Sequence, residues 1–349
     1  MIDTPDTPTI ALAPMEGVVD YPLRDLLTRL GGLDSCVTEF VRITDQVLPR
    51  KVYTRLCPEL IDIQDTARTP AGTPVAVQLL GGKPEWLAAN GRKVALLGAA
   101  AVDINFGCPA KTVNRHDGGA CLLQTPERVY DIVRATRDAV PTHTPVTAKV
   151  RLGFSDRSRY LDIAQAAAEG GADRLTVHAR SKVDGYRPPA YWDCVGHIQA
   201  ALRIPVVVNG DIWSVSDYLR ARAESGCTHV MIGRGLLSCP DLARQIKAHL
   251  SGEDYLPLTW LEVAQLVFQH YDISKPLFPK KYLGNRLKQW LAHLKRQYTG
   301  AQAFFDKVKT LRDEADIDRC FAALFTDQSA VQQQENERPP CNPSTIPQT

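Results

Sequence analysis

The sequence has no long apolar run, and we expect no secretory leader. None of its apolar stretches approaches the roughly 18 residues that a membrane-spanning helix needs. The N-terminus, MIDTPDTPTI, lacks the basic and apolar regions of a signal peptide. We therefore expect a cytoplasmic protein without a membrane partner.

The nine cysteines form no metal-binding or disulfide pattern. Their number is odd, they are scattered, and no CxxC pair occurs. These features argue against a zinc site and against a disulfide framework, so we expect no metal. If one cysteine has a chemical role, its neighbours must single it out.

Charge is nearly balanced, with a net of +2 over 349 residues, but it is unevenly distributed. Between Lys275 and Arg312 there are ten Lys or Arg residues and one acidic residue. A concentrated basic stretch is typical of a nucleic-acid-binding surface. A solvated helix face is the alternative interpretation.

Short β-branched runs alternate with helical patterns over most of the chain. The eight candidate strands span 9–15, 36–41, 75–81, 101–106, 146–152, 174–179, 205–210 and 229–233. Helical patterns fill most intervals, although 42–74 is long and rich in proline. Such alternation predicts a parallel sheet, and eight repeats favour a (β/α)8 TIM barrel. An open doubly wound sheet is less favoured, because no GxGxxG turn follows a strand.

The pattern changes after about Pro257, where strand-like runs stop and helical periodicity continues to residue 326. The sequence thus predicts an N-terminal extension at 1–8 and a catalytic barrel at 9–256. A small all-helical domain follows at 257–327. The polar, proline-rich segment 328–349 is expected to be a disordered tail.

Every predicted strand ends in at least one polar or ionisable residue. In a TIM barrel the carboxyl ends of the strands form the active site, so these residues are candidates for it. The set comprises Met15 with Glu16, Glu39, Gln78, Asn105 with Cys108, Lys149 with Arg151, His178 with Arg180, Asn209 with Asp211, and Gly233 with Arg234.

Two glycine-containing turns follow the last two predicted strands, at 209–211 and 233–235. Glycines let backbone N–H groups approach an anion, and Arg234 adds positive charge, so these turns predict a phosphate site. Two tight turns without a ligand are the alternative. A cofactor held there would direct its ring toward Gln78 and Lys149, where a lysine can stabilise a reduced flavin. A structural salt bridge would also satisfy Lys149.

Cys108 differs from the other cysteines in its surroundings. It lies just past the fourth predicted strand, between Gly107 and Pro109, in a glycine-rich segment. A mobile loop over a barrel mouth suits a group that reacts when the substrate binds. Lys111 is near enough in sequence to tune the thiol pKa. A buried, inert cysteine is the alternative.

Taken together, these segments resemble the motifs of bacterial tRNA-dihydrouridine synthases. The matching segments are APMEGVVD (13–20), TEFVR (38–42), Gln78, NFGCPAKTV (105–113), KVRLG (149–153), HAR (178–180), NGDI (209–212) and GRG (233–235). They occur in the family's order and cover roughly residues 9–325. TEFVRITDQVLP and RLKQWLAHLKRQY are similar to the C-type subfamily, which acts on uridine 16.

The resemblance implies an FMN enzyme that uses NADPH to reduce the 5,6 double bond of a D-loop uridine in tRNA. The uridine would be flipped into the barrel mouth, and Cys108 would donate the proton. The implied FMN contacts are Pro14, Met15, Glu16, Gln78, Lys149, His178, Asn209, Gly210, Asp211, Gly233 and Arg234. The implied tRNA contacts are Arg42, Asn105, Tyr186, Arg286, Lys288, His293 and Lys309. We expect a monomer.

Two positions depart from the family pattern, and two other functions stay open. Ser181 stands where the family often has Thr, and Asp184 where it often has Gln. A small-molecule FMN barrel enzyme, such as a dihydroorotate-type dehydrogenase, would give no reason for the basic helical region. A non-catalytic RNA-binding protein would give no reason for the cofactor residues and Cys108.

Overall fold

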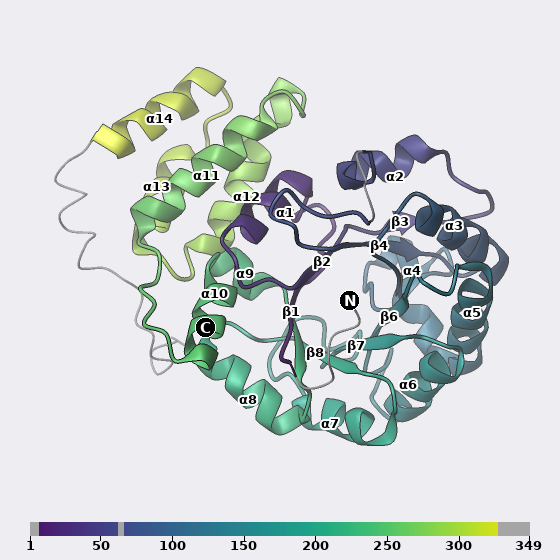
Figure 1. Ribbon diagram of the computed structural model, residues 1–349. Helices are drawn as coiled ribbons and strands as arrows, with labels where there is room; N and C mark the ends of the chain where they lie inside the picture. Colours follow the sequence, from purple (N-terminus) through teal and green to yellow (C-terminus); the bar gives the residue numbers. More distant parts are fainter. Residues whose placement is uncertain (1–6, 62–65, 327–349) are drawn as a thin grey trace. The chain divides into compact units, whose positions relative to one another are not determined.

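The computed structural model describes residues 7–61 and 66–326 (Figure 1). The chain divides into two compact units. The barrel unit comprises Met1–Gly17, Leu33–Ile212 and Asp217–Gly233. The helical unit comprises Val18–Gly32, Trp213–Ser216 and Arg234–Thr349.

The barrel unit is built on a closed parallel sheet. Its ring consists of β1 (Ile10–Leu12), β2 (Ser35–Val37), β4 (Val75–Leu80), β5 (Ala101–Asn105), β6 (Val146–Arg151), β7 (Arg174–His178), β8 (Val206–Asn209) and β9 (His229–Ile232). Parallel pairing of β1 with β9 and of β2 with β4 closes the ring. The predicted TIM barrel is therefore confirmed.

One predicted strand, 36–41, is divided in the structure. β2 ends at Val37, and the two-residue β3 (Val41–Arg42) pairs with the far end of β4. Between them the Thr38 hydroxyl accepts the Gln78 backbone N–H at 3.1 Å. A side chain thus takes a place in the ladder that a backbone carbonyl would fill, which a pattern of β-branched residues does not reveal.

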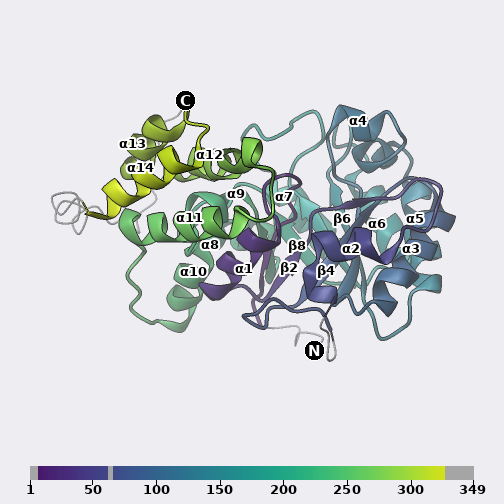
Figure 2. The same ribbon diagram turned by 90° about the horizontal axis from the view of Figure 1, so that it is seen from above.

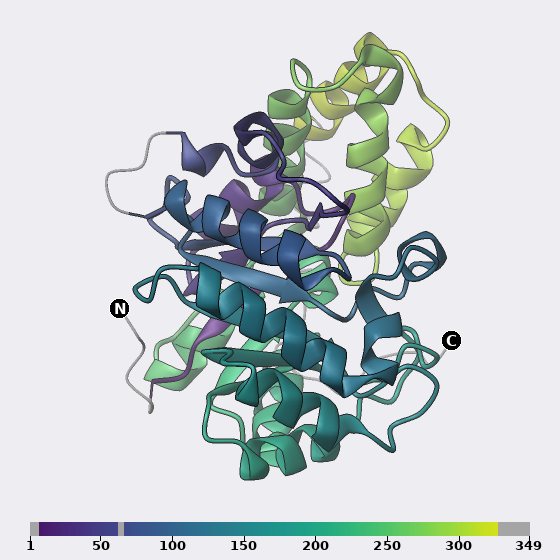
Figure 3. The same cartoon turned by 90° about the vertical axis from the view of Figure 1, so that its right-hand side faces the viewer.

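Helices surround this ring (Figure 1). They include α3 (Pro84–Leu96), α5 (Pro126–Ala139), α6 (Tyr160–Glu169) and α7 (Trp192–Ala201), and α8 (Val215–Ser225) follows β8. Figure 3 shows α3 and α5 side by side, and these two helices make extensive contact. The uncertain interval 42–74 contains α2 (Arg50–Leu56) and the short helix η1 (Pro58–Leu60). After β5 the chain forms α4 (Lys111–Asn114) and η2 (Gly119–Gln124).

The helical unit contains α1 (Tyr21–Arg29), α9 (Arg234–Ser238), α10 (Leu242–Ser251), α11 (Trp260–Ser274), η3 (Lys280–Tyr282), α12 (Leu283–Leu294), α13 (Thr299–Val308) and α14 (Glu314–Thr326). Thr259 and Glu262 form a capping box that starts α11. Phe321 packs against Phe304 at a centroid distance of 4.7 Å and against Phe268 at 5.0 Å. These rings hold α11, α13 and α14 together (Figure 2).

The helical region after the barrel is thus confirmed, whereas the division at residue 256 stays a prediction. By contacts, α1, α9 and α10 group with the C-terminal helices. The predicted tail, 328–349, and most of the predicted extension, 1–8, lie outside the described residues. Across 7–61 and 66–326, every helix is too short or too polar to span a membrane.

Candidate active site at the carboxyl ends of the barrel strands

The strand register places polar residues in rows inside one side of the barrel. Paired positions of neighbouring strands share a face. Gln78 pairs with Asp103, and Asp103 pairs with Thr147. Nearer the carboxyl ends, Asn105 pairs with Lys149. In contrast, small or apolar residues on β1, β2, β8 and β9 form a buried cluster of Ala11, Ala13, Val37, Val207 and Met231.

A chain of hydrogen bonds connects these rows to Cys108. Gln78 Nε2 donates to the Asp103 carboxylate at 2.7 Å, and Asn105 Nδ2 donates to Gln78 Oε1 at 2.7 Å. Asn105 Oδ1 accepts the backbone N–H groups of Gly107 at 2.9 Å and Cys108 at 3.0 Å. The residue expected to react is therefore tied to the barrel interior through two amide side chains.

The Cys108 carbonyl is held as well. It accepts from Asn114 Nδ2 at 3.0 Å and from the Ala120 backbone N–H at 3.1 Å. Gly119, with φ of +68°, passes so close that an added Cβ would lie 2.8 Å from this carbonyl oxygen. At least one glycine of the predicted mobile loop thus permits a close approach between two backbone segments.

The Cys108 thiol is half-buried, and burial raises its pKa above the ordinary value. The Ala110 backbone N–H opposes this rise, Glu16 adds to it, and Arg151 opposes it. Lys111, which the sequence suggested as the tuning charge, is exposed and is not among these influences. A thiol with a raised pKa stays protonated at neutral pH.

Arg151 joins the Cys108 loop to the loop that follows β7. Its Nε donates to the Gly107 carbonyl at 2.8 Å, and its Nη1 donates to the carbonyls of Ser181 at 3.1 Å and Gly185 at 3.0 Å. The guanidinium also lies 5.3 Å from the centre of the Tyr186 ring. The Tyr186 side chain remains accessible, with 52% of the residue exposed.

Lys149 is half-buried at the mouth of the barrel. Its Nζ donates to Asn209 Oδ1 at 2.9 Å, while Asn209 Nδ2 donates to the Met231 carbonyl at 2.8 Å. Burial and the nearby Arg151 together lower the pKa of Lys149 to about 7, although Asp103 opposes them. No carboxylate among the described residues is ion-paired with Lys149, so the alternative of a structural salt bridge is not realised.

Two consecutive residues of the turn after β8 have positive φ values. Gly210 has φ of +120° and Asp211 has φ of +53°. Trp192 Nε1 donates to the Gly210 carbonyl at 2.9 Å, and the fully buried Arg180 is ion-paired with Asp211. Arg180 Nη1 is buried and has no hydrogen-bond partner in the described part of the chain. A buried donor of this kind suits a ligand acceptor.

The ends of β1, β2 and β9 complete the barrel mouth. The Gly17 backbone N–H donates to Glu39, and an added Cβ on Gly233 would lie 3.4 Å from Met15 Sδ. Glu16 has a pKa that burial raises and Arg42 lowers. Arg234 follows Gly233 directly as the first residue of α9, in the helical unit.

The structure thus brings most predicted barrel residues to one end of the sheet. Gln78 is enclosed rather than accessible, because it is 0% exposed and both its amide atoms are engaged by protein. Asp103 and Thr147 were missed. The signal was present, since Asp103 lies two residues before Asn105 in a strand and shares its face.

Three of the four predicted tRNA contacts in the helical unit are already engaged by neighbours. Arg286 Nε lies 3.7 Å from Asp20 Oδ2, and the Lys288 ammonium donates to the Leu311 carbonyl. Lys309 Nζ lies 2.7 Å from Asp306 Oδ1. Of these three cations, Lys309 has the most exposed side chain for which the structure gives a value, 49% against 21% for Arg286.

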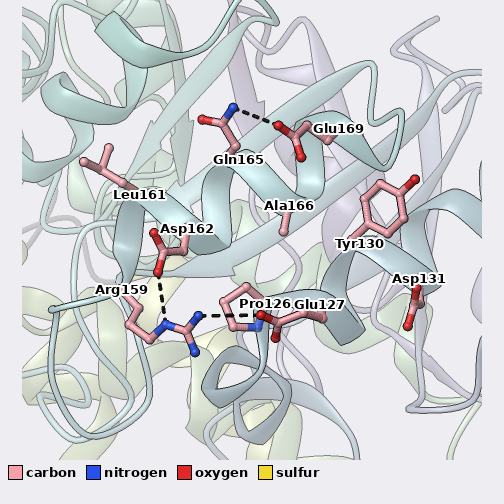
Figure 4. A pocket seen from close by; sticks show the side chains of 10 residues that line it. All are labelled: Pro126, Glu127, Tyr130, Asp131, Arg159, Leu161, Asp162, Gln165, Ala166 and Glu169. Carbon is pink, nitrogen blue, oxygen red and sulfur yellow. Dashed lines mark hydrogen bonds and ion pairs between the residues drawn. The ribbon is translucent and has the colours of Figure 1, made fainter.

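A groove of about 570 Å³ lies outside the ring, between α5 and α6 (Figure 4). Its acidic side chains include Glu127, Asp131, Asp162 and Glu169, and Arg159 bridges Glu127 and Asp162. No predicted site residue lines this groove. Its largely acidic lining disfavours the binding of a polyanion.

Comparison with known proteins identifies the family of the chain. Residues 11–327 match the family described as dihydrouridine synthase (Dus). The tRNA-dihydrouridine(16) synthase of Aquipseudomonas alcaligenes is 49% identical over 313 residues, which are 90% of this chain and 98% of the relative. The protein of the same name from Neisseria meningitidis serogroup B is 47% identical over 309 residues, with coverage of 88% and 92%.

Solved structures support the fold alone. Histamine dehydrogenase from Rhizobium sp. 4-9 superposes with a TM-score of 0.51 at 14% identity, over 69% of this chain and 45% of that one. A 2-naphthoyl-CoA reductase gives a TM-score of 0.52 at 13% identity, over 70% and 50%. The family match covers most of the sequence, including every described strand from β2 onward. The chain therefore belongs to the dihydrouridine synthase family.

Proposed function

We propose that this protein is a tRNA-dihydrouridine synthase that uses FMN and NADPH to reduce uridine 16 in the D-loop of tRNA. Family membership and the names of the relatives support the reaction and the substrate. The observation that carries the assignment of a catalytic group is the anchored, half-buried Cys108 thiol at the carboxyl end of β5.

Two features of the barrel mouth support a flavin site there. The positive-φ turn at Gly210 and Asp211, with Gly233 and the following Arg234, would hold the phosphate. Lys149 would lie by the flavin ring and favour its reduced anion. When bound, FMN would supply the hydride that adds to uracil C6. Pro14, Met15, Glu16, His178 and Asn209 complete the proposed contacts, whereas the enclosed Gln78 would act on the site only through Asn105.

Cys108 would donate the proton that uracil C5 needs. A proton donor must be a thiol rather than a thiolate, and the raised pKa of Cys108 keeps it in that form at neutral pH. The buried Nη1 of Arg180 has an unused proton that suits a uracil carbonyl. Asn105 would lie at the uracil edge with its amide already oriented.

The tRNA would be positioned through its phosphates and would present a flipped uridine to the barrel mouth. The proposed contacts are Arg42, Asn105, Tyr186, Arg286, Lys288, His293 and Lys309. The basic stretch 275–312 supports this assignment over a small-molecule flavoenzyme, because a small substrate would not need it. We propose that the enzyme acts as a monomer.

The test separates the two half-reactions. Cys108→Ala should retain FMN and be reduced by NADPH at the wild-type rate, because neither step uses the thiol. The reduced variant should reduce tRNA at a rate at least about 100-fold lower than that of the wild type. General acid catalysis contributes a rate factor of roughly 10²–10⁴, and the variant lacks the acid. Both steps can be followed by flavin absorbance under anaerobic conditions.

Cys121→Ala is the matched control. Cys121 is also half-buried, its pKa is also raised by burial, and it lies in the following helix η2. It should react with tRNA normally. Normal transfer by Cys108→Ala would refute the assigned role. Mapping dihydrouridine in tRNA from a deletion strain would test the position, and loss at a site other than 16 would refute the subfamily assignment.

A further inference from the structure

Asp103 is a carboxylate enclosed inside the barrel, where only 2% of the residue is exposed. Gln78 and Thr147 occupy the same row on the two neighbouring strands. Gln78 Nε2 donates to Asp103 Oδ2, and the Thr147 hydroxyl donates to Asp103 Oδ1. Both carboxylate oxygens are therefore engaged, each by a donor on a different strand.

This carboxylate imposes a direction on the hydrogen bonds above it. An ionised carboxylate only accepts, so Gln78 must turn its NH₂ toward Asp103. The Gln78 carbonyl oxygen then faces Asn105, so Asn105 must donate a hydrogen bond to it from its own NH₂ group. As a result, Asn105 presents its oxygen to the backbone N–H groups of Gly107 and Cys108.

Each link depends on the one below it. An amide side chain has two nearly isosteric ends, and its neighbours decide which end faces which way. If Asn105 were turned round, its NH₂ would face two backbone N–H groups and both bonds would be lost. The placement of the Cys108 peptide thus depends on the acceptor at Asp103, two side chains away.

We propose that Asp103 is a positioning residue for the Cys108 reaction, which sets the orientation of Gln78 and Asn105 and thereby the place of the thiol at the barrel mouth. The inference rests on the proposed function, because it assumes that Cys108 acts on a substrate. Asp103 itself does not touch the reacting atoms.

The energetic setting supports a directing role over a packing role. Burying a carboxylate is costly, and burial raises the pKa of Asp103 to about 6, against the effects of Gln78, Thr147 and Lys149. A row with only a packing role would be filled by apolar residues, as on β1 and β2, where Ala11 and Val37 are buried. A charge held at such a cost has a use when it orders other polar groups.

The expected effect is intermediate rather than complete. If the Asn105 amide reverses, Asn114 and Ala120 still donate hydrogen bonds to the Cys108 carbonyl. The loop therefore remains partly fixed. A displacement of about 1 Å of a catalytic group can cost roughly 100-fold in rate. Asp103→Asn should therefore slow the transfer from reduced enzyme to tRNA by about 10- to 100-fold.

The experiment uses the flavin-loaded enzyme and full-length tRNA. Asp103→Asn keeps the shape but can donate as well as accept, so the direction is no longer imposed. Flavin content and reduction by NADPH should remain near wild type. The rate of Cys108 alkylation by iodoacetamide, measured against pH, should shift, because the thiol has a new environment. A merely structural change in the barrel core would leave this profile unmoved.

Two further variants make the test specific. Thr147→Val removes the other hydrogen bond to Asp103 but none of the hydrogen bonds that connect Asp103 to Cys108. This variant should therefore reduce tRNA at the wild-type rate. Gln78→Glu combined with Asp103→Asn moves the obligate acceptor one strand over. The carboxylate introduced on β4 would accept from the amide introduced on β5 and from Asn105. The orientation of the Asn105 amide is then the same as in the wild type. The rate of tRNA reduction per bound flavin should therefore be at least about 10-fold higher than in Asp103→Asn.

The outcomes are distinct from those of the proposed function. If reduced wild-type enzyme does not react with tRNA, the proposed function fails. If wild type reacts and Asp103→Asn matches it in rate and in alkylation profile, the inference about Asp103 fails alone. A slow Asp103→Asn variant that the double substitution does not improve would also overturn it, since direction would then not be the cause. If Asp103→Asn does not fold, the double variant decides by the same rate.

Discussion

Replacing Lys149 with methionine is expected to stabilise the flavin-free protein while lowering its affinity for flavin. The side chain lies on β6 inside the barrel mouth, and Asn209 is its hydrogen-bond partner. Burial and the nearby Arg151 lower its pKa from 10.5 to about 7, although Asp103 opposes them. Methionine fills a similar volume without a charge.

The magnitude follows from the pKa change. A fall from 10.5 to about 7 corresponds to roughly 5 kcal/mol, at about 1.4 kcal/mol for each tenfold change in the protonation equilibrium. Lost hydrogen bonding to Asn209 costs about 1 kcal/mol. Partial solvent access to Lys149 further reduces the stabilisation expected from removing the charge. We therefore expect methionine to raise the free energy of unfolding by about 2–3 kcal/mol at pH 7.

The sign of the pH dependence is fixed by the direction of the shift. Between pH 7 and 10.5 the unfolded chain binds a proton at Lys149 that the folded chain has released. Wild-type stability therefore rises with pH through this window. The advantage of methionine should be greatest at pH 7 and below, and should fall to less than about 1 kcal/mol near pH 9.5.

Urea unfolding of flavin-free protein at pH 7, 8 and 9.5 measures this difference. Lys51→Met is the control, because Lys51 is exposed on α2 and its removal should change stability by less than about 0.5 kcal/mol at each pH. A methionine variant that is less stable than wild type at pH 7, or an advantage that does not change with pH, would refute the reasoning. Unchanged flavin affinity would refute the proposed ring contact.

Two further outcomes are expected. Gly119→Ala should lower the free energy of unfolding by about 1–3 kcal/mol, because φ is +68° and the new Cβ would lie 2.8 Å from the Cys108 carbonyl oxygen. Gly72→Ala, at φ of +86° but with nothing within 4 Å of its Cβ, reports the backbone strain alone, and an equal loss would contradict the packing argument. Lys309→Ala should weaken tRNA binding and reduce the slope of log affinity against log salt by about 1. Lys307→Ala on α13 is its control, and equal slopes for the two variants would argue against a specific contact at Lys309.

The barrel was predictable because its signal is repeated. Most strands are short buried runs with β-branched residues, such as Val206–Asn209, and most are followed by a helix with its own periodicity. The missed helix α2 shows the limit. It begins after Pro49 without a side-chain cap, so the sequence lacks the usual signal for a helix start.

Which elements group together was less predictable than the elements themselves. The helix expected after the first strand is present as α1, but it contacts α11 and groups with the helical unit. Its buried Asp20 caps its own first turn through Leu23 and also lies 3.4 Å from His270. An amphipathic pattern shows that a helix has a buried face, but not which distant segment covers that face.

The candidate site was predictable where residues lie at strand ends and less so below them. Cys108, Lys149 and Asn209 could be chosen as candidates from their positions alone. Polar residues at the carboxyl ends of barrel strands are seldom needed for packing, so they indicate function. Asp103 lies deeper, among valine and isoleucine, and reads as part of an ordinary strand. Only the register of β4, β5 and β6 shows that Gln78 and Thr147 flank it.

Ionisable residues are buried inside the barrel on β5 and β6, although charged side chains usually lie at the surface. Asp103, Lys149 and Arg151 are each shifted in pKa by burial, the acid upward and the two bases downward. Each shift means that the folded state resists the charge, so these three residues oppose stability as isolated groups. Stability must come from elsewhere in the barrel, for example from the apolar cluster on β1, β2, β8 and β9. Positions that break a local rule without a packing benefit are where function is expected, so this cost near the half-buried Cys108 thiol supports the proposal that the reaction takes place there.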